Sequence, residues 1–171
     1  MPFAAEMEER MKTLVAYFSC SGVTKKVGQS IAEILLGDLY EIKPEVPYSS
    51  ADLNWNDPNS RSSLEMKNKT SRPAIIKDIE NMEQYDVIFI GFPIWWYLAP
   101  TIINTFLESY DFKDKTIVPF ATSGGSGAGE TDKYLQVSCS NDVNWYQTTV
   151  LNGFSQGQLT KWLNDLNLYE E

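Results

Sequence analysis

Hydroxyl side chains cluster at one junction near the start of the chain, where an apolar run ends and a helical pattern begins. Three hydroxyls and one glycine fall within six residues, namely Ser19, Cys20, Ser21, Gly22, Val23 and Thr24. The amino terminus of a helix has free N–H groups and the positive end of the helix dipole, and both attract anions. A glycine lets the backbone approach closely, so that successive N–H groups form an anion-binding concavity. The junction therefore predicts a site for a compact phosphate group.

This junction differs from the two common nucleotide-binding motifs. One of them needs a lysine at a fixed place after its glycines, and the other needs three glycines around the turn. The chain has neither pattern here. The alternative to a phosphate site is an ordinary strand-to-helix loop capped by Ser or Thr. The loops later in the chain favour the phosphate site.

Two later loops have residues suited to a flat aromatic ring. The first follows the apolar run 87–90, and its candidate residues are Pro93, Ile94, Trp95, Trp96 and Tyr97. The second follows the run 116–120, and its candidates are Thr122, Ser123, Gly124, Gly125, Ser126 and Gly129. A tryptophan can stack on a ring, and a glycine-rich backbone can bring N–H groups to its polar edge. A ring joined to a phosphate describes flavin mononucleotide (FMN). The alternatives are core packing, which we expect for one of the two tryptophans, and a flexible solvent loop.

Apolar patterns divide the chain into alternating strands and helices. Strands are predicted at 14–18, 38–43, 87–90, 116–120 and around 144–150, and helices at 25–36, 73–83, 100–109, after the glycine-rich loop and at the end of the chain. Parallel neighbours require right-handed crossover connections. The pattern predicts an α/β fold, a three-layer sandwich whose five-stranded parallel sheet has the order 2-1-3-4-5 and helices on both faces. All three loops then lie at the carboxyl edge of the sheet, at its switch point.

The length of 171 residues is that of one compact domain. Residues 1–10 are polar and patternless, so we expect a disordered segment or an extension before a single domain over 11–171. Within it, residues 45–72 are rich in Ser, Asn, Asp and Pro and lack periodicity. A loop of this length is usually functional or disordered. We expect it to fold over part of the site, with Trp55 as its anchor.

Composition narrows the chemistry and the partners. The chain has no histidine, the commonest general base and metal ligand, so any chemistry must come largely from a cofactor. A net charge of −9 and a pI near 4.5 argue against nucleic acid and anionic membranes as partners, and favour proteins with basic surfaces. No apolar stretch is long enough to cross a bilayer, and no signal peptide is recognisable. We expect a cytoplasmic protein in which Cys20 and Cys139 are free thiols.

The three loops, in this order and at strand ends, resemble those of the flavodoxin family over nearly the whole chain from Met11 onward. Ser19-x-Ser21-x-x-Thr24 is similar to the family's phosphate loop. By the same resemblance, the loop from Gly91 to Trp96 flanks the flavin ring and 122–126 contacts its pyrimidine edge. The Trp-Trp pair and the Ser-Gly-Gly-Ser loop look most like one group of flavodoxin-like proteins. The resemblance implies a flavodoxin-like fold, FMN as the cofactor and electron transfer as the activity.

Two departures from the family's electron carriers bear on mechanism. These proteins usually place a tyrosine over the outer flavin face, and none occurs in 122–129. They also tend to have a glycine beside the flavin N5 atom, and 95–98 contains none. A non-glycine residue in the required backbone conformation costs about 1–3 kcal/mol. Such a cost would weaken the stabilisation of one-electron reduced flavin and favour two-electron chemistry.

Two functions therefore stay open, both with FMN. One is a redox protein that passes electrons between proteins. The other is an FMN-dependent NAD(P)H oxidoreductase acting on quinones or similar acceptors, with a pocket walled by Trp55 and Tyr97. A response-regulator-like domain shares the strand order, but it needs an aspartate after the third strand, where this chain has Gly91-Phe92-Pro93. No acidic spacing identifies a metal site.

Overall fold

The structure is a computed structural model that describes residues 12–168, so the predicted extension 1–10 lies outside the described residues. Its strands are β1 (Thr13–Tyr17), β2 (Asp38–Glu41), β3 (Val87–Pro93), β4 (Thr116–Thr122), β5 (Asn144–Trp145) and β6 (Thr149–Val150). They form one sheet in the order β2-β1-β3-β4-β5, in which β6 also pairs with β4 and all pairs are parallel. This confirms the predicted order. The predicted fifth strand is divided into two short pieces, β5 and β6, that pair with opposite ends of β4.

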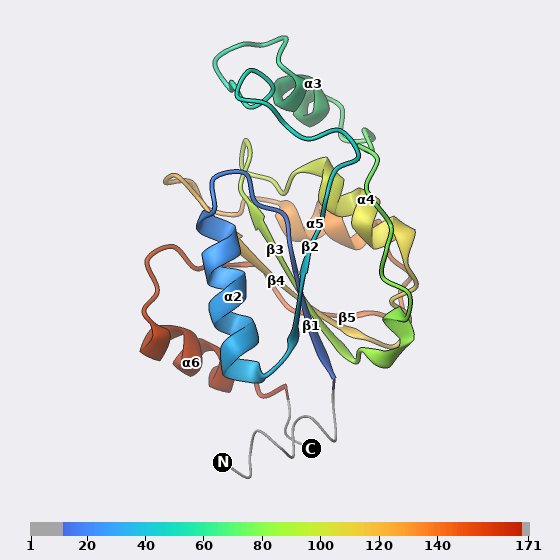
Figure 1. Cartoon of the computed structure of the whole chain (residues 1–171), viewed down its shortest axis with the longest axis vertical. Coiled ribbons are helices and arrows are strands. Elements are labelled where there is room, and N and C mark those ends of the chain that lie inside the picture. The colour runs from blue at the N-terminus through green and yellow to red at the C-terminus, as the bar shows by residue number, and fades with distance from the viewer. Residues whose placement is uncertain (1–11, 169–171) are drawn as a thin grey trace.

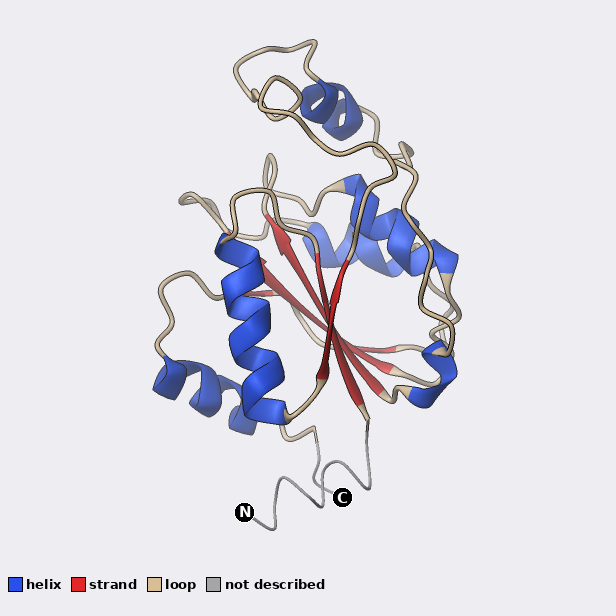
Figure 2. Cartoon of the chain, in the orientation of Figure 1, coloured by secondary structure: helices blue, strands red, loops and turns tan. Residues whose placement is uncertain are grey.

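Helices cover both faces of the sheet, as predicted (Figures 1 and 2). They are α2 (Val23–Leu35), α3 (Arg61–Lys67), α4 (Thr101–Ser109), α5 (Thr131–Gln136) and α6 (Gln156–Asp165), with a 3₁₀ turn η1 at Met82–Gln84. Helices α2 and α6 lie on one face of the sheet and pack on Val15 and Phe89. Helix α4 lies on the other face, over Leu14 and Ile88. Neighbouring strand residues thus face opposite layers, which gives the sheet two apolar cores. No helix within residues 12–168 is long and apolar enough to span a membrane.

The helix predicted at 73–83 is wrong. Ile75 forms an antiparallel bridge with Pro44, and two backbone hydrogen bonds flank it, from Glu45 N to Ala74 O and from Ile76 N to Lys43 O, both 2.9 Å long. Ile75 is also buried. The spacing of Ile75 and the isoleucines after it is also that of a helix. In the structure, however, the N–H group of Ile76 and the C=O group of Ala74 are satisfied by pairing in an extended form with the segment just after β2.

The insertion at 45–72 stands at the carboxyl end of the sheet, beyond the other loops (Figure 1). It is irregular apart from the seven-residue helix α3, whose first turn is capped by Ser60 through a bond from Ser63 N (3.3 Å). The prediction that Trp55 anchors it is wrong, because the Trp55 side chain is 70% exposed. Tyr48 packs against the core instead, and Met66 is the buried apolar residue of α3.

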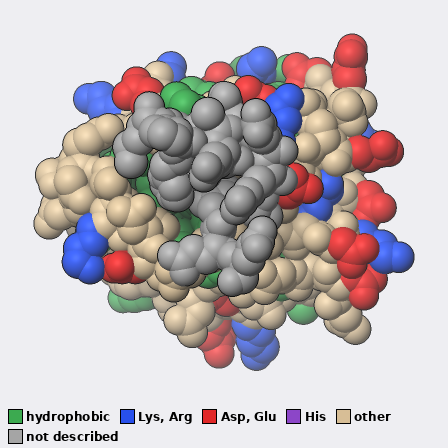
Figure 3. Space-filling model, turned by 90° about the horizontal axis from the view of Figure 1, so that it is seen from below, with side chains coloured by type: hydrophobic (Ala, Val, Ile, Leu, Met, Phe, Trp, Pro, Cys, Tyr) green, Lys and Arg blue, Asp and Glu red, His purple; other side chains and the backbone are tan. Residues whose placement is uncertain are grey.

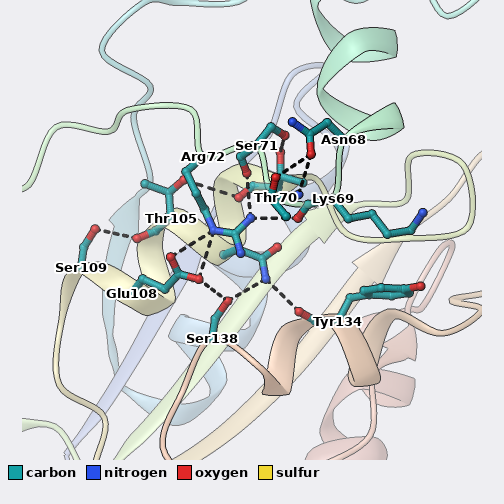
Figure 4. A network of polar contacts seen from close by, with 12 residues as sticks. Asn68, Lys69, Thr70, Ser71, Arg72, Thr105, Glu108, Ser109, Tyr134 and Ser138 are labelled. Carbon is teal, nitrogen blue, oxygen red and sulfur yellow. Dashed lines mark hydrogen bonds and ion pairs between the residues drawn. The ribbon is translucent and has the colours of Figure 1, made fainter.

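A polar network holds the end of the insertion against α4 and α5 (Figure 4). Arg72 Nε lies 3.0 Å from both carboxylate oxygens of Glu108 in α4, and Ser138 Oγ donates to the same carboxylate at 2.7 Å. Asn104 continues the network by donating to Ser138 Oγ and to Tyr134 O, both at 2.8 Å. The return from the insertion to the sheet is therefore fixed in place.

Candidate functional site

The phosphate loop is a tight turn between β1 and α2. Gly22 has φ 89°, in the left-handed region that favours glycine, and its N–H donates to Ser19 Oγ at 3.1 Å. No side chain caps α2 among the residues described, and no acidic residue lies in its first turn. The first N–H groups of this helix are thus open to an anion. Cys20 and Ser21 are exposed on the loop, as is Val23 at the helix start.

One hydroxyl of this loop points inward and joins it to the next strand ends. Thr24 is 2% exposed, and its Oγ1 lies 2.7 Å from Oγ1 of the buried Thr122 at the end of β4. A direct bond between two buried hydroxyls leaves neither of them unsatisfied. The phosphate loop and the glycine-rich loop are therefore fixed relative to each other.

The loop after β3 contains a two-residue reverse turn. Trp95 N donates to Leu98 O (2.8 Å), and Leu98 N donates to Trp95 O (3.1 Å). Between them Trp96 and Tyr97 have φ 49° and 65°, the pattern of a type I′ turn, which normally contains Asn and Gly. We call residues 95–98 the Trp-Tyr turn. It holds two large aromatic residues in the left-handed conformation, each at a cost of about 1–2 kcal/mol.

The two tryptophans have different surroundings. Trp95 packs edge-on against Phe18 and Tyr48, with ring centroids 5.8 and 5.7 Å apart, and belongs to the border of the core. Trp96 is 45% exposed and Tyr97 is 63% exposed. The expectation that one tryptophan packs against the core is confirmed for Trp95, and Trp96 has the more exposed indole.

The glycine-rich loop is held by its own polar contacts. Ser123 Oγ lies 3.1 Å from Ser126 Oγ and accepts from Gly125 N at 3.1 Å. Asn152 brackets the start of the loop, accepting from Ser123 N (2.5 Å) and donating to Ser123 O (2.7 Å). The sequence analysis missed Asn152, although an Asn-Gly pair directly after the last strand is a turn signal at this same edge.

Gly129 joins this loop to the Trp-Tyr turn. Its φ is 54°, and a Cβ added there would stand 2.6 Å from Tyr97 O. A residue larger than glycine would meet backbone at this point, where movement is restricted. Thr131 adds a weak contact, since its Oγ1 lies 3.4 Å from Tyr97 O. Thus two of the three predicted loops touch directly, and Thr24 links the third to them.

A hollow of about 440 Å³ lies between the insertion and these loops. Its walls are Leu53, Trp55, Ser62, Ile94, Trp95, Trp96, Tyr97 and Ser126. Ser62 is 2% exposed, and its Oγ has no hydrogen-bond partner among the residues described. A buried hydroxyl without a partner is costly, so its presence in the wall favours a polar ligand atom nearby. Pro93 lies at the end of β3, next to this wall.

The titratable groups near the site offer little acid–base chemistry. Although Cys20 is exposed on the loop, desolvation by the surrounding protein raises the pKa of its thiol to about 11, an effect that Arg61 opposes and Glu65 increases. The thiol is therefore protonated at neutral pH and a poor nucleophile. Within residues 12–168, no three His, Cys, Asp or Glu side chains are grouped so as to hold a metal ion. The site is suited to binding and positioning a ligand.

Comparison with known proteins identifies the family. Residues 12–166 match the flavodoxin family, and the chain belongs to it. The fold and the family predicted from the loops are thereby confirmed. No curated protein sequence matches the chain significantly.

Solved structures extend this result. A candidate flavoprotein from Bacteroides eggerthii is 47% identical, with a TM-score of 0.87 over 93% of this chain and 99% of the other. A candidate flavoprotein from Bacteroides uniformis is 48% identical, with a TM-score of 0.85 over 90% and 98%. A flavoprotein from Lactobacillus acidophilus, in complex with FMN, is 25% identical, with a TM-score of 0.64 over 90% and 99%. These similarities support the predicted cofactor.

Proposed function

We propose that this protein binds FMN and uses it to transfer electrons between partner proteins. The observation that carries the proposal is the union of the three loops in one site. Thr24 bonds to Thr122, and Gly129 lies against the backbone of Tyr97. Sites in open parallel sheets lie at this carboxyl edge, and the FMN complex of the L. acidophilus relative supports the choice of ligand.

Different residues of the site would bind the phosphate and the ring of FMN. The N–H groups at the start of α2, with the hydroxyls of Ser19 and Ser21, suit the phosphate, because they supply donors without any carboxylate in the first helical turn. Trp96 supplies an exposed indole for the ring, and Ser62 supplies an unpaired hydroxyl in the facing wall. Bound FMN supplies the uptake and release of electrons.

The net charge of the chain indicates what kind of partner protein it would bind. The chain carries a net charge of −9, which steers it toward basic surfaces. On the face below the sheet, opposite the insertion, acidic and basic side chains are interspersed around the rim (Figure 3). A docking partner would therefore be attracted by the overall field. A cytoplasmic location remains part of the proposal, supported by the free thiols of Cys20 and Cys139.

The second candidate is an FMN-dependent NAD(P)H oxidoreductase. The observation in its favour is space: a second hollow adjoins the 440 Å³ hollow, with Trp55 and Trp96 in the lining of both, and would give a small molecule room beside the site. Stepwise anaerobic reduction, followed by visible absorption, separates the two functions. Accumulation of one-electron reduced FMN without NAD(P)H oxidation supports the carrier. Direct bleaching by NADH or NADPH supports the reductase.

Binding of FMN is tested first, by quenching of flavin fluorescence. We expect saturable, one-to-one binding, and the absence of binding would refute both functions. Ser62→Ala should raise the Kd for FMN about fivefold, because a hydrogen bond contributes about 1 kcal/mol. It should leave the apoprotein as stable or more stable, since it removes an unpaired hydroxyl. Ser109→Ala is the matched control: it removes a bonded hydroxyl in α4 (2.6 Å to Thr105 O) and should lower stability without changing FMN affinity.

A further inference from the structure

A second hollow, of about 310 Å³, adjoins the first on the side of the insertion. Trp55 and Trp96 line both hollows and so form the partition between them. Pro58, Met66 and Leu98 supply further apolar wall. The volume is at the lower end of the range for small-molecule sites, about 300–1,000 Å³. The space suits a compact ligand of two or three fused rings.

The polar part of this hollow is cationic. Its charged lining residues are Lys67 and Lys69, and no Asp or Glu of residues 12–168 lines it. The whole chain has 23 acidic and only 14 basic residues, so a concave surface with two lysines and no carboxylate departs from the average. Such a surface attracts an anion despite the negative charge of the protein.

Both ammonium groups are held near the wall and retain hydrogen-bonding capacity. Lys67 Nζ donates to Pro58 O at 2.8 Å, and Lys69 Nζ lies 5.4 Å from the centre of the Tyr134 ring. A lysine has three N–H donors, so each contact leaves others for a ligand. Neither lysine takes part in an ion pair with a described residue.

The aromatic part of the hollow is unusually exposed. Trp55 is 70% and Trp96 45% exposed, although both are large apolar side chains. The backbone at Trp96 is fixed by the two hydrogen bonds that close the Trp-Tyr turn. Indoles at an accessible wall are typical of sites that stack on flat rings.

From these features we propose that the second hollow binds a small planar aromatic anion, the small-molecule partner of the flavin site. The ring would lie against Trp55 and Trp96, and the negative group would lie near Lys67 and Lys69. For the role of the ligand, this inference rests on the second candidate function, the FMN-dependent oxidoreductase. Binding itself is a property of the hollow and is measurable in the oxidised protein.

The test is calorimetric titration of the oxidised, FMN-loaded protein with two matched probes. Anthraquinone-2-sulfonate has a planar ring system and a negative charge, and 2-(hydroxymethyl)anthraquinone has the same ring system without the charge. We expect the sulfonate to bind at least tenfold more tightly. Equal affinities, or no binding of the sulfonate, would overturn the proposal.

Lysine variants locate the bound anion. The double variant Lys67→Gln/Lys69→Gln should weaken sulfonate binding at least tenfold and change binding of the uncharged probe less than twofold. Lys161→Gln is the charge-matched control on α6, where Nζ pairs with Asp165 (2.7 Å), and it should change neither. An equal effect of the control, or none of the double variant, would show that the sulfonate binds elsewhere.

Two further measurements separate the possible failures. FMN affinity of each variant shows whether the flavin site is intact, and titration of the apoprotein shows whether the hollow binds the sulfonate without FMN. Absence of FMN binding by the wild type therefore refutes both candidate functions, whereas failure of the apoprotein and the FMN-loaded protein to bind the sulfonate refutes the proposal for the hollow. Competition with NADPH then identifies the source of the anion: displacement of the sulfonate indicates a dinucleotide phosphate, and its absence indicates a free aromatic acid.

Discussion

The phosphate loop and the Trp-Tyr turn solve the same backbone problem in opposite ways. Each must enter the left-handed region to turn sharply at the edge of the sheet. The phosphate loop does so at Gly22, where the conformation has no steric cost. The turn does so at Trp96 and Tyr97, where it costs about 1–2 kcal/mol per residue. One loop is relaxed, and the other stores strain beside the place where a ring would bind.

Strain of this kind persists only where the surroundings impose it. Two hydrogen bonds between Trp95 and Leu98 close the turn, and Gly129 fills the space behind Tyr97. The backbone that carries Trp96 and Tyr97 is therefore fixed before any ligand binds. We infer from this difference that the phosphate loop can adjust closely to a small anion, whereas the Trp-Tyr turn gives a rigid backbone to a surface on which a ring can stack.

The largest expected effect comes from removing the support of the turn. Gly129→Ala combines an unfavourable φ of 54° with a Cβ placed 2.6 Å from Tyr97 O, so we expect a loss of about 3 kcal/mol in the free energy of unfolding. Urea denaturation measures it. Gly124→Ala, where a Cβ would meet nothing within 4 Å, should stay within about 0.5 kcal/mol of the wild type. Similar losses in both variants would contradict the proposed support.

A smaller effect is expected at the relaxed loop. Gly22→Ala meets no atom within 4 Å but keeps φ at 89°, so only the backbone conformation is penalised, by about 1–2 kcal/mol. Urea denaturation of the apoprotein gives this value. Fluorescence titration should show weaker binding of FMN, because the N–H groups around the phosphate would shift. An apoprotein as stable as the wild type would show that the left-handed conformation at this position is dispensable.

The converse substitution should relieve strain in the turn. Tyr97→Gly places the permissive residue at φ 65°, and because the side chain is 63% exposed, little packing is lost. We expect a net gain of about 0.5 kcal/mol after the greater chain entropy of glycine is counted. Thermal unfolding detects it as a raised Tm. A lowered Tm would mean that the turn is not strained and that the two loops differ only in composition.

The smallest effect concerns the ion pair between Arg72, at the end of the insertion, and Glu108 in α4, and it depends on pH. Partial burial raises the pKa of Glu108, but the hydrogen bonds from Arg72 and Ser138 outweigh it, so the pKa lies below its ordinary value. A lowered pKa in the folded state means stability that is present above the ordinary pKa and lost as pH falls through the lowered one. Glu108→Gln should therefore reduce the fall in stability between neutral and acidic pH. An unchanged acid profile would show that the contact adds nothing.

Much of the fold could be predicted because buried parallel strands leave a strong signal. The run Val87-Ile88-Phe89-Ile90 is continuously apolar, and the alternation with helices limits the order of the strands. Residues 73–83 misled because isoleucines at helical spacing do not reveal that 74–76 pairs with 43–45. The short helix α3 was missed, since seven residues with few apolar side chains give little periodicity.

The candidate site was predictable for residues that directly follow a predicted strand and are of a type that can bind a phosphate or a ring. The three loops follow β1, β3 and β4, so topology alone brings them together. The sequence could not reveal Ser62, because its role depends on where the insertion folds back. The Asn152-Gly153 pair indicated a turn, but not that Asn152 would bond to Ser123. The sequence also could not show that Trp96 and Tyr97 adopt positive φ, since neither residue type favours that conformation.

The narrow neck of the insertion has a consequence for how this protein can change. Residues 43–45 and 74–76 are joined by two backbone hydrogen bonds, so everything between them forms a closed loop. Doubling the length of such a loop costs only about 0.6 kcal/mol in closure entropy. The length and sequence of this segment can therefore change while the sheet and the phosphate loop stay the same. Grafting insertions from relatives onto this neck is a direct route to flavoproteins with altered ligand preference.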